Sequence, residues 1–276
     1  MPSLLVNIGC GAAWHPDWTN LDVRPASPHV RTWNVAEGLP FSNETVDVCY
    51  ASHVIEHLSP KQAGILLLES RRVLRRGGVI RLVVPDLEGI AREYLRVLAR
   101  AEIGEVAVAR QYEWITLEML DQLVRTESGG EMGRYLRSRA RQNADYVWSR
   151  IGSEAAPYLG REGTSLDSSD GVQGQRWRRA VTGLREQVVT ALCSVLLGRR
   201  GRLAIQEGLF RSSGECHRWM YDQFSLRQLL EQNGFSDVRR CAASESRIDK
   251  FDSYHLDVVN GEARKPDSLF MEAVRP

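Results

Sequence analysis

Short apolar runs, each closed by a polar or glycine residue, alternate with turns over the first 86 residues. The runs that predict buried strands cover residues 4–8, 20–23, 29–35, 46–51 and 79–84. Between the last two, Pro60–Leu74 has helical periodicity, with Ile65, Leu68 and Val73 or Leu74 expected to face the core. Strands that alternate with helical patterns predict an α/β fold with a mostly parallel sheet.

The expected helix ends in a basic turn, which suits the negative end of its dipole, and Gly77–Gly78 is expected to stop it. From residue 87 to about residue 200 the periodicity is helical. The α/β pattern returns with a helix over Ser225–Asn233, for which Ser225 is the expected N-cap and Gly234 follows the end. Val238–Ala243 and Ser268–Val274 then predict two last strands, antiparallel to each other.

This layout predicts one α/β domain that is divided by a helical insertion. Residues 1–86 are expected to form its N-terminal part, 87–215 the insertion or lid, and 216–276 its C-terminal part. The composition, with 43% hydrophobic residues and a formal net charge of +1, fits a globular protein with a substantial core. The charge shows no basic excess, so nucleic acid is not an expected partner.

The five cysteines are scattered and odd in number, which predicts neither a disulfide framework nor a zinc ribbon. Reduced thiols in the cytoplasm are the simplest interpretation. The N-terminus lacks the basic lead and cleavage site of a signal peptide. The longest apolar run, Val188–Leu197, is shorter than the roughly 20 residues of a spanning helix, so no transmembrane segment is expected.

Small and polar residues follow the first three predicted strands. Asn7–Gly11 directly follows the first, and its glycines allow a ligand to approach the backbone closely. Asp22 ends the second strand, where a carboxylate can accept hydrogen bonds from both ribose hydroxyls, and Asn34 ends the third, where it could contact an adenine. Ligands of open parallel sheets bind outside the carboxyl ends of strands, so these positions predict a nucleotide-type site.

Several motifs resemble the class I methyltransferases of the type 11 group over residues 4–86, and more loosely over about the last 50 residues. They are Asn7–Gly11, Leu39–Phe41, Val46–His53, Glu56–Leu58 and Arg75–Gly78. The resemblance implies a Rossmann-like sheet of seven strands and S-adenosylmethionine as cofactor. It places residues along four strand ends in the cofactor site: Asn7, Gly9, Cys10, Gly11, Asp22, Asn34, Val35, Ser52 and His53.

Two features depart from that family. The acidic residue usual at the position of Asn7 is missing. Only ten residues separate Gly11 from Asp22, so Trp14–Trp18 is expected to form a short turn in place of the usual helix. The short spacing and the missing third glycine also disfavour a dinucleotide-binding dehydrogenase.

Four residues are candidates for work on the methyl acceptor. His53 and His57 follow the fourth strand, His217 lies where the insertion rejoins the core, and Asp86 ends the fifth strand. A histidine can remove a hydroxyl proton near neutral pH. For each of them, packing or capping is the alternative interpretation.

The segment His53–His57 also fits the His-x-x-Glu-His pattern of some zinc peptidases. Because the methyltransferase resemblance already covers this segment, no metal is expected. The insertion is expected to hang over the cofactor as a lid. For Val188–Leu197, packing within the lid or across a homodimer is preferred to peripheral contact with a membrane surface.

Relatives with this core and a tail like Lys265–Phe270 are often encoded with bacterial surface-polysaccharide genes. That resemblance implies a small-molecule or glycan acceptor, methylated on a hydroxyl oxygen. Two alternatives stay open: an N- or O-methyltransferase of another natural product, and a catalytically silent scaffold that binds S-adenosylmethionine.

Overall fold

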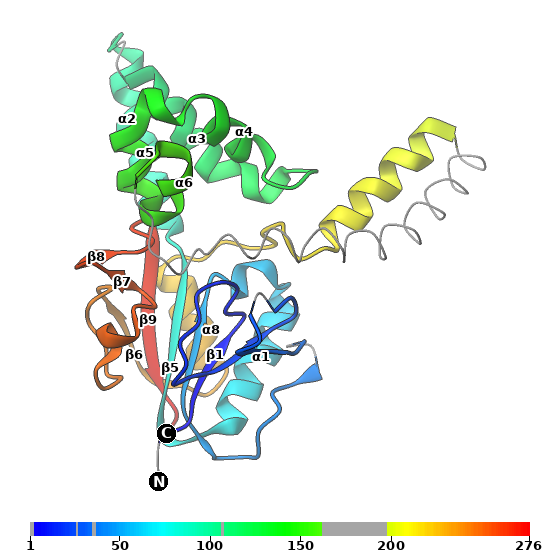
Figure 1. Cartoon of the computed structure of the whole chain (residues 1–276), viewed down its shortest axis with the longest axis vertical. Coiled ribbons are helices and arrows are strands. Elements are labelled where there is room, and N and C mark those ends of the chain that lie inside the picture. Colours follow the sequence, from blue (N-terminus) through cyan, green and yellow to red (C-terminus); the bar gives the residue numbers. More distant parts are fainter. Residues whose placement is uncertain (1–2, 26, 35–36, 106–107, 162–197) are drawn as a thin grey trace.

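The computed structural model describes residues 3–25, 27–34, 37–105, 108–161 and 198–276. A sheet with helices against it occupies one half of the molecule, and a group of helices lies beyond one end of the sheet (Figure 1). Of the helices described, none is long and apolar enough to cross a membrane.

The sheet has seven strands in the order β3-β2-β1-β4-β5-β9-β6. Their bounds are β1 Leu5–Ile8, β2 Thr19–Asp22, β3 Val30–Thr32, β4 Val46–Ser52, β5 Leu74–Pro85, β6 Ser236–Cys241 and β9 Ser268–Val274. The first five strands pair in parallel, whereas β9 is antiparallel to both β5 and β6. The predicted mostly parallel, Rossmann-like sheet is therefore confirmed, and so is the antiparallel pairing of the last two strands.

Helix α1, Pro60–Val73, buries Val73 as predicted, but the rest of its buried face differs from the predicted one. Ser59 caps it in a capping box with Gln62, and Pro60 occupies its first position. Its buried residues are Ala63, Leu66, Leu67, Ser70 and Val73. Ile65 and Leu68 are exposed, so their predicted core positions are wrong. The run Ile65–Leu68 is apolar all round, and periodicity could not choose the buried face.

The predicted role of Gly77–Gly78 is also wrong. The chain leaves α1 at Val73 and enters β5 at Leu74. The pairing of β5 with β4 shifts between Val46 and Val48, so the two glycines lie in an irregular start of the strand. Gly78 packs so closely there that a Cβ would lie 2.9 Å from the Arg75 carbonyl oxygen.

Helix α8, Gln223–Gln232, has its N-cap three residues before the predicted one. Asp222 is the N-cap and accepts a hydrogen bond from the backbone N–H of Ser225. The Ser225 hydroxyl closes the capping box, so Ser225 is the third helical residue and not the cap. Gly234 follows the helix with a φ of +81°, as its predicted place requires.

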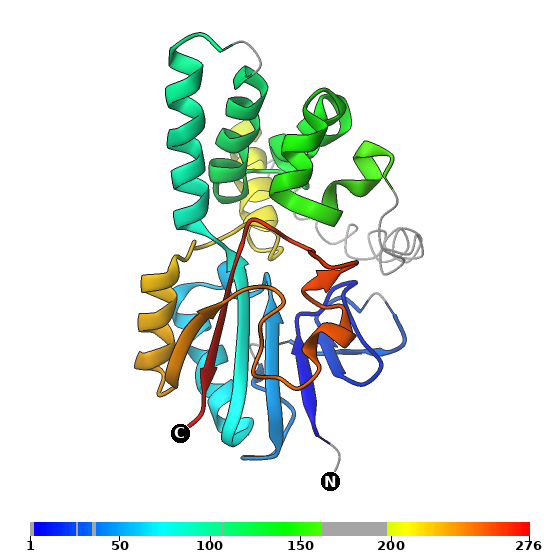
Figure 2. The ribbon, with the colours of Figure 1, turned by 90° about the vertical axis from the view of Figure 1, so that its left-hand side faces the viewer.

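The described part of the segment after β5 consists mainly of helices joined by short turns. Its helices are α2 Leu87–Glu102, α3 Ala109–Val124, α4 Gly130–Ser138, α5 Ala144–Ile151 and α6 Ala156–Leu159, with 3-10 turns at Ala140–Asn143 and Gly152–Ala155. Residues 198–211 are helical as well. These helices lie beyond the carboxyl ends of the parallel strands (Figure 2). Trp177 and the apolar run Val188–Leu197 lie outside the described residues.

The insertion has a core of its own, in which Trp114, Tyr135, Val147 and Ile151 are buried together. A second cluster joins α2 to α3 through Ile90, Val97 and Ile115. Of the aromatic residues described there, Trp114 and Tyr135 are thus core residues, which is the commoner role of scattered aromatics.

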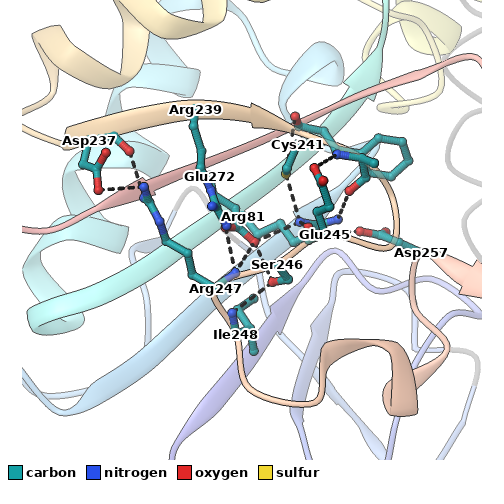
Figure 3. A network of polar contacts seen from close by, with 12 residues as sticks. Arg81, Asp237, Arg239, Cys241, Glu245, Ser246, Arg247, Ile248, Asp257 and Glu272 are labelled. Carbon is teal, nitrogen blue, oxygen red and sulfur yellow. Dashed lines mark hydrogen bonds and ion pairs between the residues drawn. The ribbon is translucent and has the colours of Figure 1, made fainter.

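A buried arginine on β5 fixes the loop that follows β6 (Figure 3). Arg81 is fully buried and pairs with Asp257 at 2.7 Å and with Glu272 of β9 at 2.9 Å. Its guanidinium also donates to the carbonyl oxygens of Ala243 and Glu245. The remaining strands of the loop region are β7 Val258–Val259 and β8 Glu262–Ala263, and Phe251–Tyr254 forms a 3-10 turn.

Candidate functional site

The carboxyl ends of β1, β2 and β4 meet at the edge of the sheet that faces the insertion (Figure 2). Residues Asn7–Gly11, Asp22 and Ser52–His53 lie at these ends. In an open parallel sheet this edge is where ligands bind. The topology therefore brings the three groups of residues together as the sequence analysis expects.

The two glycines after β1 have different surroundings. Gly9 has a φ of +66°, and a Cβ there would lie 2.5 Å from Cγ2 of Val54. Gly11 has a φ of +53°, and a Cβ would meet no atom within 4 Å. Gly9 thus lets the segment after β4 pack against the loop, while Gly11 leaves open space beside the backbone for a ligand.

The Asn7 side chain holds the loop after β1 through hydrogen bonds. It is buried, and its side-chain N–H₂ donates to the Ala13 carbonyl oxygen at 2.9 Å and to the Asn20 side-chain oxygen at 3.2 Å. Asn20 in turn donates to the carbonyl oxygens of His15 and Trp18. Residues 11–18 contain turns and no helix, which confirms the short turn expected there. The amide at position 7 explains how so short a connection is held.

The Asp22 carboxylate is fixed at the end of β2. One oxygen accepts the Gly11 N–H at 2.8 Å and the other accepts the Arg24 N–H at 2.7 Å. Two backbone N–H groups orient the carboxylate and leave it lone pairs, since each oxygen can accept more than one hydrogen bond. Asp22 is held as a ribose-binding carboxylate must be, next to the open side of Gly11.

The remaining predicted cofactor residues are Cys10, Asn34, Val35 and Ser52, and the structure describes all of them except Val35. Burial raises the pKa of the Cys10 thiol to about 12, so it stays protonated. Asn34 lies two residues beyond β3, which ends at Thr32 and is shorter than predicted, and its carbonyl oxygen accepts the Glu37 N–H. Val35 lies outside the described residues. Ser52 is the last residue of β4 and pairs with Val83 of β5.

These features fit S-adenosylmethionine. The open face of Gly11 would admit the methionine part, and Asp22 would hold the ribose hydroxyls. Position 7 carries an amide and no carboxylate, so contact with the amino group of the cofactor would run through water or backbone carbonyl oxygens.

A second group of polar residues follows β4. His53 has a φ of +55°, a left-handed conformation that few non-glycine residues adopt, and its backbone N–H donates to the Val83 carbonyl oxygen. Its Nε2 lies 3.0 Å from the Ser268 hydroxyl, and its Nδ1 lies 3.1 Å from Oε1 of Glu56. The strained backbone turns the imidazole toward Glu56.

Glu56 is a residue of this group that the sequence analysis did not select as a candidate. It lies in the 3-10 turn Ile55–His57 and is fully buried. Neither carboxyl oxygen makes a hydrogen bond with good geometry to a described residue. Burial raises the pKa of this carboxyl to about 8. A buried carboxyl without partners is costly, and such groups often belong to functional sites.

His57 and His217 complete the cluster. Their rings lie 4.7 Å apart, edge to face. Nδ1 of His57 lies 3.3 Å from the Cys216 carbonyl oxygen, which can only accept, so Nδ1 carries the proton and Nε2 keeps a free lone pair. The two predicted histidines, far apart in sequence, are therefore neighbours in space.

All three histidines are held neutral. Burial and the positive charges of Lys265 and Arg264 hold the pKa of His53 well below its usual range. Burial lowers the pKa of His57. For His217, burial and the neighbouring His57 together lower the pKa to about 3. Their ring nitrogens therefore offer lone pairs at neutral pH.

The insertion places His217 in this cluster. The His217 N–H donates to the Gln122 carbonyl oxygen near the end of α3. The next two residues, Arg218 and Trp219, donate their N–H groups to the Glu56 carbonyl oxygen at 2.7 and 3.2 Å. The lid and the turn that carries Glu56 are thereby joined, and the Trp219 side chain beside them stays half exposed.

Asp86, the fourth predicted catalytic residue, has a separate partner. It precedes α2 and pairs with Arg240 of β6 at 3.0 Å through Oδ2, while Oδ1 is buried and makes no hydrogen bond to a described residue. Its backbone N–H donates to the Asp267 carbonyl oxygen. The ion pair with Arg240 gives Oδ2 a structural role. That Asp86 contacts the methyl acceptor stays a prediction.

Comparisons with known proteins agree with this geometry. Residues 20–82 match a family model described as a methyltransferase domain. No curated protein matches the chain.

Among solved structures, a methyltransferase from Archaeoglobus fulgidus is 12% identical, with a TM-score of 0.40 over 99% of this chain and 86% of that one. One from Thermotoga maritima is 11% identical, with a TM-score of 0.36 over 99% and 82%. A phosphoethanolamine N-methyltransferase from Haemonchus contortus is 10% identical, with a TM-score of 0.35 over 100% and 50%. Similarities at this level bear on neither acceptor nor mechanism.

The matched domain model covers β2 to β5, which is the stretch that carries Asp22, Ser52 and the residues after β4. Taken with the seven-stranded sheet, it supports a class I methyltransferase that uses S-adenosylmethionine as its cofactor.

Proposed function

We propose that this protein methylates a hydroxyl oxygen of a saccharide or glycosylated small molecule. The observation that carries the proposal is the cluster that His53 and His57, directly after β4, form with His217, next to the strand ends proposed for the cofactor; all three histidines are neutral because their pKa values are lowered. Val54, between His53 and the 3-10 turn, packs on Gly9, so the cluster and the cofactor loop are in contact.

S-adenosylmethionine, when bound, supplies a methyl group on a sulfonium: the acceptor oxygen forms a C–O bond as the S–C bond breaks and its electron pair returns to sulfur. The protein must then hold the acceptor in line and take up the hydroxyl proton. Nε2 of His57 has a free lone pair and is the favoured proton acceptor, because both ring nitrogens of His53 have partners.

A saccharide is favoured by the half-exposed indole of Trp219. Its backbone is bound to Glu56, so the ring stays near the histidine cluster. An exposed aromatic face can pack against the apolar face of a sugar ring while the hydroxyls point to polar groups. The likeness of the Lys265–Phe270 tail to relatives encoded with polysaccharide genes points in the same direction.

The test is turnover with S-adenosylmethionine and a panel of saccharides, glycosylated compounds and simple amines. We expect formation of S-adenosylhomocysteine and a mass gain of one CH₂ unit on a sugar. His57→Gln should lower kcat by roughly 100-fold or more, whereas His255→Asn, at an exposed loop position, should not.

Methylation of amines alone would favour the natural-product alternative. Cofactor binding without turnover on any acceptor would favour the scaffold.

A further inference from the structure

The group Glu56, His57 and His217 has the composition of a metal site. One carboxyl oxygen and one ring nitrogen from each histidine all lie within 4.8 Å of one another. Two imidazoles and a carboxylate are a common ligand set for Zn²⁺ and related divalent transition metals, and imidazole is a poor ligand for Mg²⁺ and Ca²⁺. The residue types therefore select a class of cation.

The state of Glu56 points independently to a ligand. Its side chain is fully buried, and both oxygens lack a hydrogen bond to the described part of the chain. Of the described residues, only His53 lies within ion-pair distance, at 3.1 Å. Burial of a carboxyl group without hydrogen bonds costs free energy, and a bound cation would supply the missing partner.

The positive charges around the cluster have other partners. The Lys265 ammonium lies 2.6 Å from Oε1 of Glu154. The Arg125 guanidinium donates to the Glu215 carbonyl oxygen. Both cations thus contact groups outside the cluster, and among the described residues neither forms an ion pair with Glu56.

The surrounding contacts resemble those that orient metal ligands. His57 is fixed through Nδ1 by the Cys216 carbonyl oxygen, which directs Nε2 away from it. His53 holds one oxygen of Glu56. Histidine ligands commonly donate their second ring N–H to a carbonyl or carboxylate in this way. His57 is only partly buried, which gives a cation and an acceptor access from solvent.

We propose that Glu56, His57 and His217 bind one divalent transition-metal ion of the Zn²⁺ class, with an open coordination position for the acceptor. Three protein ligands with a fourth position open is the arrangement of catalytic zinc sites. In a tetrahedral site with bonds of about 2.1 Å, ligand atoms lie about 3.4 Å apart. The three side chains would therefore move slightly toward one another on binding.

The role of the ion rests on the proposed function. A hydroxyl bound to such an ion loses its proton more readily, as metal-bound water does. Nε2 of His57 would then be a ligand, and the hydroxyl proton would pass to solvent. The ion would thus replace His57 as the means of activating the acceptor oxygen.

The first test needs no variant and no cofactor. Metal-free full-length protein is titrated with Co²⁺ and with Zn²⁺, and binding is followed by calorimetry and by visible Co²⁺ absorption. We expect one equivalent per chain and the intense absorption of a low-symmetry, four- or five-coordinate site. Binding of well under one equivalent, or only the weak spectrum of hydrated Co²⁺, would overturn the proposal.

Two variants then locate the ion. Glu56→Gln keeps the shape of the side chain and removes its charge, and His217→Gln removes a second ligand; each should weaken Co²⁺ binding at least 10-fold. The matched control is His255→Asn, at an exposed histidine outside the cluster, which should bind like the wild type. Equal binding by all three variants would place the ion elsewhere and reject the site.

The two proposals can fail separately. Metal binding without methyl transfer to any acceptor would reject the proposed function and keep the site. Methyl transfer by protein that neither binds Co²⁺ nor loses activity to a chelator would reject the site and keep the function.

Discussion

Replacing Arg81 by methionine should destabilise the whole domain, because the arginine neutralises two carboxylates inside the protein. Arg81, Asp257 and Glu272 are all nearly or fully buried, and the guanidinium is within 2.9 Å of both acids (Figure 3). Methionine fills a similar volume but leaves the two negative charges without their shared cation.

Removing one partner of a buried ion pair costs about 3–5 kcal/mol. The acids keep some partners, since Tyr50 donates to Asp257 at 2.5 Å and Ser246 donates to Glu272 at 2.6 Å. Arg81 has two buried acidic partners and also binds the carbonyl oxygens of the loop after β6. We therefore expect a loss of about 3–5 kcal/mol, or a fall in Tm of roughly 6–20 °C.

The assay is urea unfolding followed by circular dichroism, with Tm measured in parallel. The matched control is Arg92→Met, which breaks the pair of Arg92 with Glu88 on the surface of α2. Exposed pairs of this kind contribute about 0.3–0.5 kcal/mol. If the two variants unfold within about 1 kcal/mol of each other, the reasoning from burial is refuted.

The effect should extend to the cofactor loop. Asp257 accepts from Tyr50, whose ring packs edge to face on Trp18 with centroids 5.9 Å apart. Trp18 lies at the end of the short turn, and the Asn20 side chain holds it there by donating to the Trp18 carbonyl oxygen. Loosening the Arg81 network should therefore also weaken binding of S-adenosylhomocysteine in Arg81→Met.

Three further predictions concern the strand ends and the joint with the lid. Asp22→Ala should weaken S-adenosylhomocysteine binding by roughly 1–3 kcal/mol, measured by calorimetry, because charged hydrogen bonds are lost. If its affinity equals that of the exposed control Asp17→Ala, Asp22 does not bind the ribose. Gly9→Ala should unfold at lower urea than Gly11→Ala, because its new Cβ would clash, whereas at Gly11 only the positive φ costs about 1 kcal/mol or more; the reverse order would contradict the packing. Burial raises the pKa of the half-buried Asp267 to about 7, above the value of 3.8 expected when unfolded, so the folded state holds a proton that the unfolded state has lost and stability should fall as pH rises through this window. Asp267→Asn should remove that fall, and a parallel pH profile of unfolding free energy in the wild type and the variant would refute it.

The sequence by itself determined the sheet and the order of its strand ends. Buried parallel strands are short apolar runs that end in polar or glycine residues, and that local pattern placed Asp22 at the end of β2 and the glycines after β1. The local pattern gave a wrong prediction at Ile65 and Leu68, because that helical run is apolar on every side. It also gave the wrong N-cap, because Asp222 and Ser225 form a reciprocal pair that either residue could begin.

Only the tertiary structure decided which residues form the polar cluster. Local spacing could place His53 and His57 after β4, but the position of His217 depends on how α3 returns to the core, since its N–H is bound to Gln122. The same packing buries Glu56 completely and leaves its oxygens without a hydrogen bond to the described residues, with only His53 among them at ion-pair distance. Burial is a property of the whole fold, and in this fold it raises the pKa of the Glu56 carboxyl, which the sequence presents only as part of a motif, to about 8.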